Sequence, residues 1–103
     1  MRTLFLAPGE AMIEKEIPNT LEGIQSAVEG LFEVVRIGRE IVCVCNDEGK
    51  IRGMQPNFRL PIDGFFDLIC GPAFFCREVH GPDGGEFADL TDEQVEYLKG
   101  WYE

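Results

Sequence analysis

Four cysteines and one histidine are the side chains of this sequence best able to bind a metal ion. Cys43 and Cys45 lie one residue apart, Cys70 and Cys76 are separated by five residues, and His80 follows. Structural zinc sites usually need C-x-x-C knuckles or an equivalent Cys/His pair. Alternate residues of a strand point the same way but lie about 6–7 Å apart, too far for a compact knuckle. We therefore expect no metal site and no cofactor.

A nucleophilic cysteine is the second chemistry that these residues could support. A catalytic thiol needs a base and an electropositive setting that lowers its pKa. Cys76 and His80 are close in sequence, but on one strand their side chains would lie far apart. Their surroundings are acidic, and nearby carboxylates raise the pKa of a thiol. We expect no catalytic residues and a protein that is not an enzyme.

Three polar residues form the candidate ligand-binding site of the sequence. Asn57, Arg59 and Asp63 lie in a segment that cannot be assigned to the core, beside the aromatic pair Phe65-Phe66. Loop residues of these types often bind a ligand. The alternative, which we favour, is that Asn57 caps a turn and Arg59 pairs with a surface acid. Asp63 also begins the tight-turn signal Asp63-Gly64.

The stretch around two of the cysteines has the pattern of a central strand. Side chains alternate along a strand, so Ile41, Cys43 and Cys45 point one way and Val42 and Val44 the other. Both faces are therefore apolar, which indicates a strand covered on both sides. Thiols in such a place behave as small hydrophobic groups.

Short apolar runs between turn signals predict the other strands. Strands are expected at residues 3–7, 11–17, 31–37, 40–46, 65–70 and 73–79. Residues 50–54 can form a short partner strand after the turn that precedes them. Residues 55–61 are expected as a loop or helical turn, because Pro56 and Pro61 exclude them from a sheet centre. Residues 80–86, rich in glycine and acids, are expected as a flexible loop.

Two helices are expected, at about 19–30 and 91–101. Asn19 can cap the first helix, and Thr91 and Gln94 form a capping box for the second. Four apolar residues of the first helix share one face: Leu21, Ile24, Val28 and Leu31.

The elements together predict one α+β domain over residues 1–103. Its sheet is expected to be mainly antiparallel, with about 5–7 strands, and the two helices are expected to pack on one face of it. An exposed edge of such a sheet would also allow homodimerisation.

The charge of the chain bears on its partners. Nineteen Asp and Glu residues against nine Lys and Arg give a net charge of −10. Such a surface repels phosphate backbones and anionic membranes, so direct binding to nucleic acid or membranes is not expected. No apolar segment approaches the ~20 residues that span a bilayer. The N-terminal residues lack the features of a secretory signal, so we expect a cytoplasmic protein.

Several segments, taken in order, resemble the domain-of-unknown-function family 3846. They are IPNTLEGIQSAVEG followed by FEVV, VCNDEGK, PNFRL, DLICGPAFFC and GEFADLTDEQVE. The family consists of small proteins of Firmicutes, often carried by phages, plasmids and conjugative elements. The resemblance covers nearly the whole chain. It implies no established activity, cofactor or catalytic residue, but it does imply a mobile-element setting.

Two functions follow as expectations from the charge and this resemblance. The first is a non-catalytic accessory factor that binds another protein, such as a host defence or replication factor. In mobile elements, small acidic proteins sometimes inhibit host defence, in some cases by imitating the charge of DNA. The alternative is a small-molecule or nucleotide-sensing module built on Asn57, Arg59 and Asp63.

Overall fold

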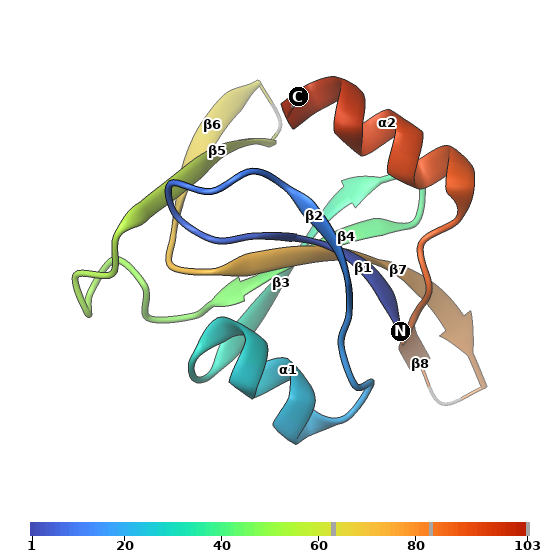
Figure 1. The fold of residues 1–103 in the computed structure, drawn as a ribbon. Coiled ribbons are helices and arrows are strands. Elements are labelled where there is room, and N and C mark those ends of the chain that lie inside the picture. Colours follow the sequence, from blue (N-terminus) through green and yellow to red (C-terminus); the bar gives the residue numbers. More distant parts are fainter. Residues whose placement is uncertain (63, 83, 103) are drawn as a thin grey trace.

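The computed structural model describes residues 1–62, 64–82 and 84–102 and shows an α+β fold (Figure 1). Within these residues, eight strands and two helices occur in the order β1, β2, α1, β3 to β8 and α2. The predicted class is confirmed. The bounds are β1 Arg2–Leu6, β2 Ile13–Glu16, α1 Leu21–Val28, β3 Phe32–Gly38, β4 Ile41–Asn46, β5 Pro56–Ile62, β6 Phe65–Cys70, β7 Ala73–Gly81, β8 Gly84–Ala88 and α2 Asp92–Tyr102.

A six-stranded antiparallel sheet forms the body of the described part of the chain. Its strand order is β2-β1-β7-β4-β3, and β8 pairs with β7. The nine residues of β7 pair with three strands: the first with β1, the last with β8, and β4 along the other edge. β5 and β6 form a separate two-stranded hairpin. β4 and β7 therefore lie inside the sheet, each paired on both edges.

The sheet separates two apolar clusters. On β4, Cys43 and Cys45 point into one cluster and Val42 and Val44 into the other. All six residues of β4 are buried. The alternation predicted from the sequence is therefore confirmed, and the thiols pack as small hydrophobic groups.

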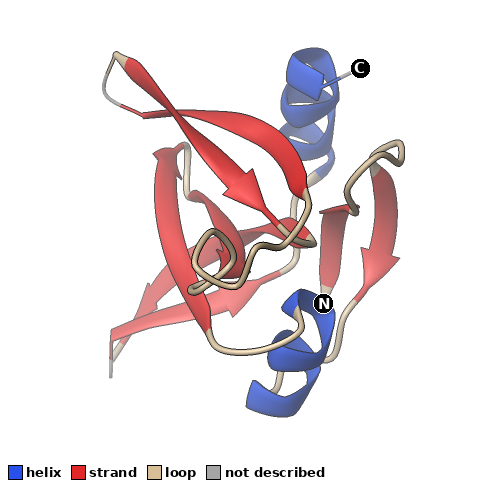
Figure 2. Cartoon of the chain, turned by 90° about the vertical axis from the view of Figure 1, so that its left-hand side faces the viewer, coloured by secondary structure: helices blue, strands red, loops and turns tan. Residues whose placement is uncertain are grey.

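The two helices lie on opposite faces of the sheet, and the expectation that they share one face is wrong. Ile24 and Val28 of α1 join the cluster that contains Val42, whereas Val95 and Leu98 of α2 join the other. Figures 1 and 2 show α1 on one side and α2, with the β5–β6 hairpin, on the other. Both faces of the central strands are apolar, so each needs its own cover.

β5 is a strand, where the sequence predicted a loop or helical turn. A two-stranded ribbon leaves every second N–H of each strand unpaired, so it tolerates Pro56 and Pro61 as the centre of a sheet would not. Ile62 lies opposite Phe65, so the connection falls where the tight-turn signal predicted it. Asp63 lies outside the described residues.

The partner strand predicted at residues 50–54 does not form. Residues 50–53 form turns, and Met54 lies in no strand. The N–H of Arg52 donates to Glu48 and that of Met54 to Gly49, at 2.8 and 2.9 Å, which curls the chain. Such i→i+4 and i→i+5 bonds are incompatible with an extended backbone.

The segment predicted as a flexible acidic loop at residues 80–86 is instead mostly paired strand. β7 continues to Gly81 and β8 begins at Gly84, with His80 opposite Gly85 in the ladder. The pairing satisfies backbone groups that a loop would leave to water.

The N-terminus of α1 is capped by a different residue from the one predicted. Thr20, not Asn19, caps α1, because its Oγ1 accepts the N–H of Gly23 at 3.0 Å. Asn19 instead donates to the carbonyl of Phe87. The predicted apolar face is only half buried: Ile24 and Val28 are buried, and Leu21 and Leu31 are exposed.

The predicted capping box of α2 is confirmed. The N–H of Gln94 donates to the Thr91 hydroxyl at 3.2 Å, and the Thr91 N–H donates to the Gln94 amide oxygen at 3.0 Å. Two N–H groups at the start of the helix are thus satisfied without a backbone partner.

Gly49 provides a test of the packing between the turn after β4 and the end of β6. A Cβ at this position would lie 2.4 Å from the backbone oxygen of Cys70. We expect Gly49→Ala to lower the free energy of unfolding by about 1–3 kcal/mol, because backbone must shift to make room. Gly100→Ala is the control: nothing lies within 4 Å of that site in α2, and alanine should stabilise the helix by up to ~1 kcal/mol. Urea unfolding followed by circular dichroism measures both, and equal stability of Gly49→Ala and wild type would contradict this packing.

Candidate binding surface

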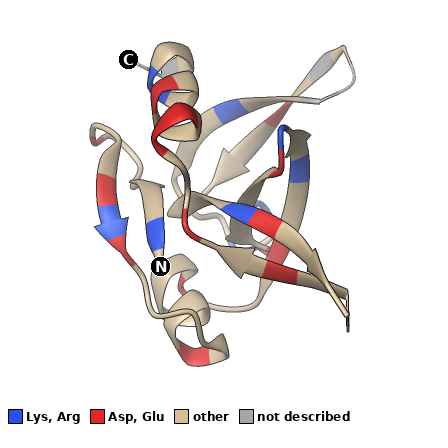
Figure 3. Cartoon of the chain, turned by 90° about the vertical axis from the view of Figure 1, so that its right-hand side faces the viewer, with Lys and Arg blue, Asp and Glu red and all other residues tan. Residues whose placement is uncertain are grey.

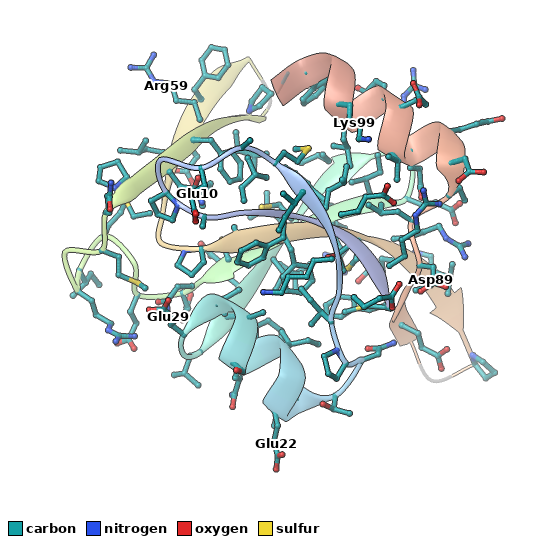
Figure 4. The ribbon with its side chains drawn as sticks, in the orientation of Figure 1. Glu10, Glu22, Glu29, Arg59, Asp89 and Lys99 are labelled. Carbon is teal, nitrogen blue, oxygen red and sulfur yellow. The ribbon has the colours of Figure 1, made fainter. Side chains whose placement is uncertain are left out.

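The outer face of the β5–β6 hairpin exposes apolar side chains. Phe66 and Leu68 of β6 are 67% and 40% exposed. Directly opposite residues of an antiparallel pair point to the same face, and these two lie opposite Pro61 and Arg59. Figure 4 shows Arg59 pointing away from the body of the protein. The inner face, with Leu60 and its neighbours, faces the core.

Ile51 extends this apolar face onto the turn that follows β4. Its side chain is 86% exposed, and Ile51 and Leu68 both line a pocket of about 170 Å³. We call the set Ile51, Arg59, Pro61, Phe66 and Leu68 the hairpin surface. The other pocket residues are Glu33, Cys45, Asn46, Asp47, Gly49, Lys50, Asp67, Ile69 and Cys70.

Three carboxylates and one lysine are among the residues that line this pocket. Glu33 and Asp47 line it, and Asp67 accepts a hydrogen bond of 2.6 Å from Lys50. This bond raises the pKa of Lys50. Both partners are partly exposed, so the pair contributes little to stability. Its main effect is to link the turn to β6 beside the apolar face.

Asn46 fixes the turn that presents Ile51. Its buried side chain donates to the carbonyl of Val28 at 2.9 Å and accepts the N–H of Glu48 at 2.8 Å. One side chain thus ties the start of the turn to the end of α1. The position of Ile51 beside β6 is therefore set by the fold.

The three residues of the predicted ligand site have different places in the structure. Asn57 donates its side-chain N–H groups to the carbonyls of Leu6 and Gly71, at 2.9 and 2.8 Å. Its amide therefore fastens the hairpin to the main sheet. Arg59 is exposed on the hairpin surface, and Asp63 lies outside the described residues. Asn57 and Arg59 lie two positions apart on β5, next to a register shift between Pro56 and Phe58. The Asn57 amide is bonded to two carbonyls, whereas the Arg59 side chain is exposed.

The environments of the thiols disfavour a nucleophile. A hydrogen bond with Cys45, followed by burial, raises the pKa of Cys43. Burial, followed by the charge of Glu78, raises the pKa of Cys76 to about 12. The thiolate that would attack a substrate is thus disfavoured at both positions. Cys76 is buried and His80 exposed, and four positions along a strand separate residues by about 13 Å.

The described residues offer no converging metal ligands. Among residues 1–62, 64–82 and 84–102, no three His, Cys, Asp or Glu side chains are placed to hold one ion. In the same residues, no helix combines the length and apolarity needed to cross a membrane.

Basic and acidic residues are intermixed on the side of the molecule seen in Figure 3. Arg2 bonds to Glu14 at 2.8 Å and to Asp92 at 2.6 Å, and Arg36 bonds to Glu78 at 2.7 Å. DNA presents an uninterrupted row of negative charge. This side of the molecule therefore differs from the uninterrupted negative charge of DNA.

The fold and the hairpin surface define a small α+β domain with an exposed apolar face bordered by acids. The chain matches the family described as "Domain of unknown function (DUF3846)" over residues 1–103, and it belongs to that family. The resemblance drawn from its sequence segments is thereby confirmed. No curated protein and no solved structure matches it significantly.

Asn57→Ala tests whether this residue is an anchor. Loss of its amide leaves the carbonyls of Leu6 and Gly71 without that partner, and we expect the free energy of unfolding to fall by about 1–3 kcal/mol. Gln55→Ala, at an exposed position two residues earlier, should change it by less than ~0.5 kcal/mol. Equal effects of the two substitutions in urea unfolding would show that the Asn57 amide is dispensable.

Cys76 should make stability depend on alkaline pH. Its thiol titrates near 12 in the folded protein against an ordinary value of 9.0, so the folded state holds the proton more tightly. The resulting stabilisation is complete below about pH 9 and is lost as the pH rises towards 12. Between pH 7 and about pH 10, wild type should lose roughly 1 kcal/mol more than Cys76→Ala. Parallel pH profiles of the two proteins in urea unfolding would refute this assignment.

Proposed function

We propose that the protein is a non-catalytic accessory factor that binds another protein through the hairpin surface. The observation that carries the proposal is the exposure of Phe66 and Leu68 on the outer face of β6, with the exposed Ile51 beside Leu68. Large apolar side chains gathered in this way are typical of protein-binding surfaces. Aromatic and arginine side chains such as Phe66 and Arg59 are enriched at such interfaces.

The anchoring of this face supports the proposal. The inner side of the hairpin packs into the core through Leu60 and Ile69, Asn57 fastens its base, and Asn46 fixes the turn that carries Ile51. A surface held in one conformation loses little entropy when a partner binds. The apolar side chains are therefore preorganised for contact.

The charge of the surface indicates the chemistry of the partner. Glu33, Asp47 and Asp67 border the apolar residues, and the whole chain carries a net charge of −10. Complementary charge favours both the rate and the specificity of association. The proposed partner segment is therefore apolar in its centre and basic at its margins.

The wider setting belongs to the same proposal. The mobile-element context that the family resemblance implies would make the partner a cytoplasmic host protein of defence or replication. Homodimerisation through the edge strand β3 would be a separate association, since β3 lies at the end of the strand order.

The small-molecule or nucleotide-sensing alternative stays a prediction for Asn57, Arg59 and Asp63. No contact of the described residues favours it at these positions, because the amide of Asn57 is already bonded to two carbonyls. We therefore place protein binding first.

A capture experiment with three matched baits tests the proposal. The baits are wild type, the double variant Phe66→Ser/Leu68→Ser, and Leu21→Ser, which removes from α1 an apolar side chain whose exposure (62%) lies between those of Leu68 and Phe66. All three should have similar circular dichroism, because exposed side chains contribute little to folding. From native host lysate, wild type and Leu21→Ser should retain the same protein, and the double variant should lose it.

The salt dependence of that complex provides the second readout. If acids at the margin contribute, affinity should fall as salt is raised, because exposed charges are screened. Retention of the same protein by all three baits, or by none, would contradict the proposal.

A further inference from the structure

A groove of about 400 Å³ separates α1 from β1 and β2, on the face of the sheet opposite α2 and the hairpin. Its volume is in the range of small-molecule sites. Apolar residues supply most of its wall, and four side chains that can form hydrogen bonds or carry charge complete it. The lining residues are Phe5, Ala7, Pro8, Lys15, Glu16, Ile17, Pro18, Gly23, Ser26, Ala27, Glu29 and Pro72.

Half of the groove wall has little side-chain freedom to lose. Alanine, glycine and proline lose no side-chain rotamer freedom when they are covered, and half of the lining consists of these residues. On the helix side, Gly23 and Ala27 are one turn apart and keep α1 from filling the space. A Cβ on Gly23 would lie 2.5 Å from the carbonyl oxygen of Pro18. The groove therefore exists before any ligand arrives, which lowers the entropic cost of binding.

Lys15 supplies a cation at the β2 side of the groove. Its Nζ lies 4.3 Å from the centre of the Phe5 ring. The acids on either side of it in sequence bond elsewhere: Glu14 to Arg2 at 2.8 Å and Glu16 to the N-terminal ammonium at 3.4 Å. In the described part of the chain, no carboxylate lies within 4.0 Å of Lys15.

Besides Glu16, the lining contains one further acid, Glu29, at the C-terminal end of α1. Glu29 is the C-cap residue of this helix, and Ser26 lies between it and Gly23. The groove thus has Glu29 at the end of α1 and Lys15 with Phe5 on its strand side, where the neighbouring Glu16 is bonded to the N-terminal ammonium. A ligand with one negative charge would place that charge at the Lys15 end.

We propose that this groove binds a small aromatic carboxylic acid. The carboxylate would pair with Lys15, and the ring would lie against Phe5 and the proline walls. Aromatic rings make favourable contacts with one another, and a charge-assisted hydrogen bond is stronger than a neutral one. This site is distinct from the hairpin surface, so it can fail or succeed independently of the proposed protein binding.

Titration with phenylacetate, followed by ¹H–¹⁵N correlation spectra, tests the proposal on the whole chain. Resonances of α1, β1 and β2 should shift and saturate, and those of the β5–β6 hairpin should not. Phenylacetamide, which has the same ring without the charge, should bind about tenfold more weakly, the loss expected for one hydrogen bond to a charged group. Octanoate, which has the charge without the ring, should also bind more weakly.

Three variants separate the contributions of the groove. Lys15→Gln should weaken phenylacetate binding about tenfold, and Ala27→Phe should abolish it by filling the space. Lys99→Gln, which removes a lysine from α2 on the opposite face, should leave it unchanged. If Ala27→Phe does not fold, Lys15→Gln decides alone.

Four outcomes would overturn the proposal. They are absence of saturable shifts at millimolar phenylacetate, equal affinity for phenylacetamide, tighter binding of octanoate, and unchanged affinity in Lys15→Gln.

Discussion

The apolar character of both faces of β4 and β7 is the constraint on which the rest of the structure depends. β4 has six consecutive buried residues, and the first four of β7 are buried as well. A strand pair of this kind must be covered on both sides. One helix cannot do this, so α1 takes one face and α2 the other. The cover beside α2 is completed by the β5–β6 hairpin, which is why a short, proline-containing ribbon persists there.

The candidate binding surface is a consequence of this arrangement. A hairpin that covers a core has an inner face, which packs, and an outer face, which does not. In β5 and β6 the inner face includes Leu60 and Ile69, and Phe58 packs against Phe75 at 5.7 Å between ring centres. The outer face could have been entirely polar, yet it carries Phe66 and Leu68. These two side chains do not join the core and remain exposed.

The groove beside α1 has a related origin. The helix has only eight residues, and the small residues Gly23 and Ala27 line the groove between it and β1 and β2. It therefore covers its face of the sheet incompletely. The same cluster that buries Ile24 and Val28 leaves room next to Phe5. Incomplete cover leaves the groove on one face of the sheet, and the outer face of the hairpin leaves apolar side chains exposed on the other.

Much of the fold could be predicted from local patterns, because alternation and capping are local. The alternation in β4 placed each thiol on the correct face, and Thr91 with Gln94 marked the start of α2. The prolines of β5 led to the wrong prediction of a loop, since a proline is excluded from the centre of a sheet but tolerated in a two-stranded ribbon. That context is not local.

The candidate site could be predicted only in part, for the same reason. Arg59 was singled out from its sequence neighbourhood, and it does lie on the exposed face. The amide of Asn57 was not recognised as an anchor to Leu6, 51 positions away, because nothing near Asn57 in sequence indicates that contact. The sequence analysis did not identify Ile51 as an exposed apolar residue. A single large apolar residue in a polar turn could have indicated this exposure. The groove at Lys15 depends on the packing of α1 against β1 and β2, which no single segment encodes.

Hydrogen–deuterium exchange of the native protein, resolved by peptide, tests the central role of β4 and β7 most directly. Backbone amides of a structural centre exchange only when the whole domain unfolds, whereas peripheral elements open locally. The account predicts the slowest exchange in β4 and β7, at the rate set by global unfolding, and faster exchange in the β5–β6 hairpin and the turn after β4. Exchange of β4 as fast as that of the hairpin would contradict it.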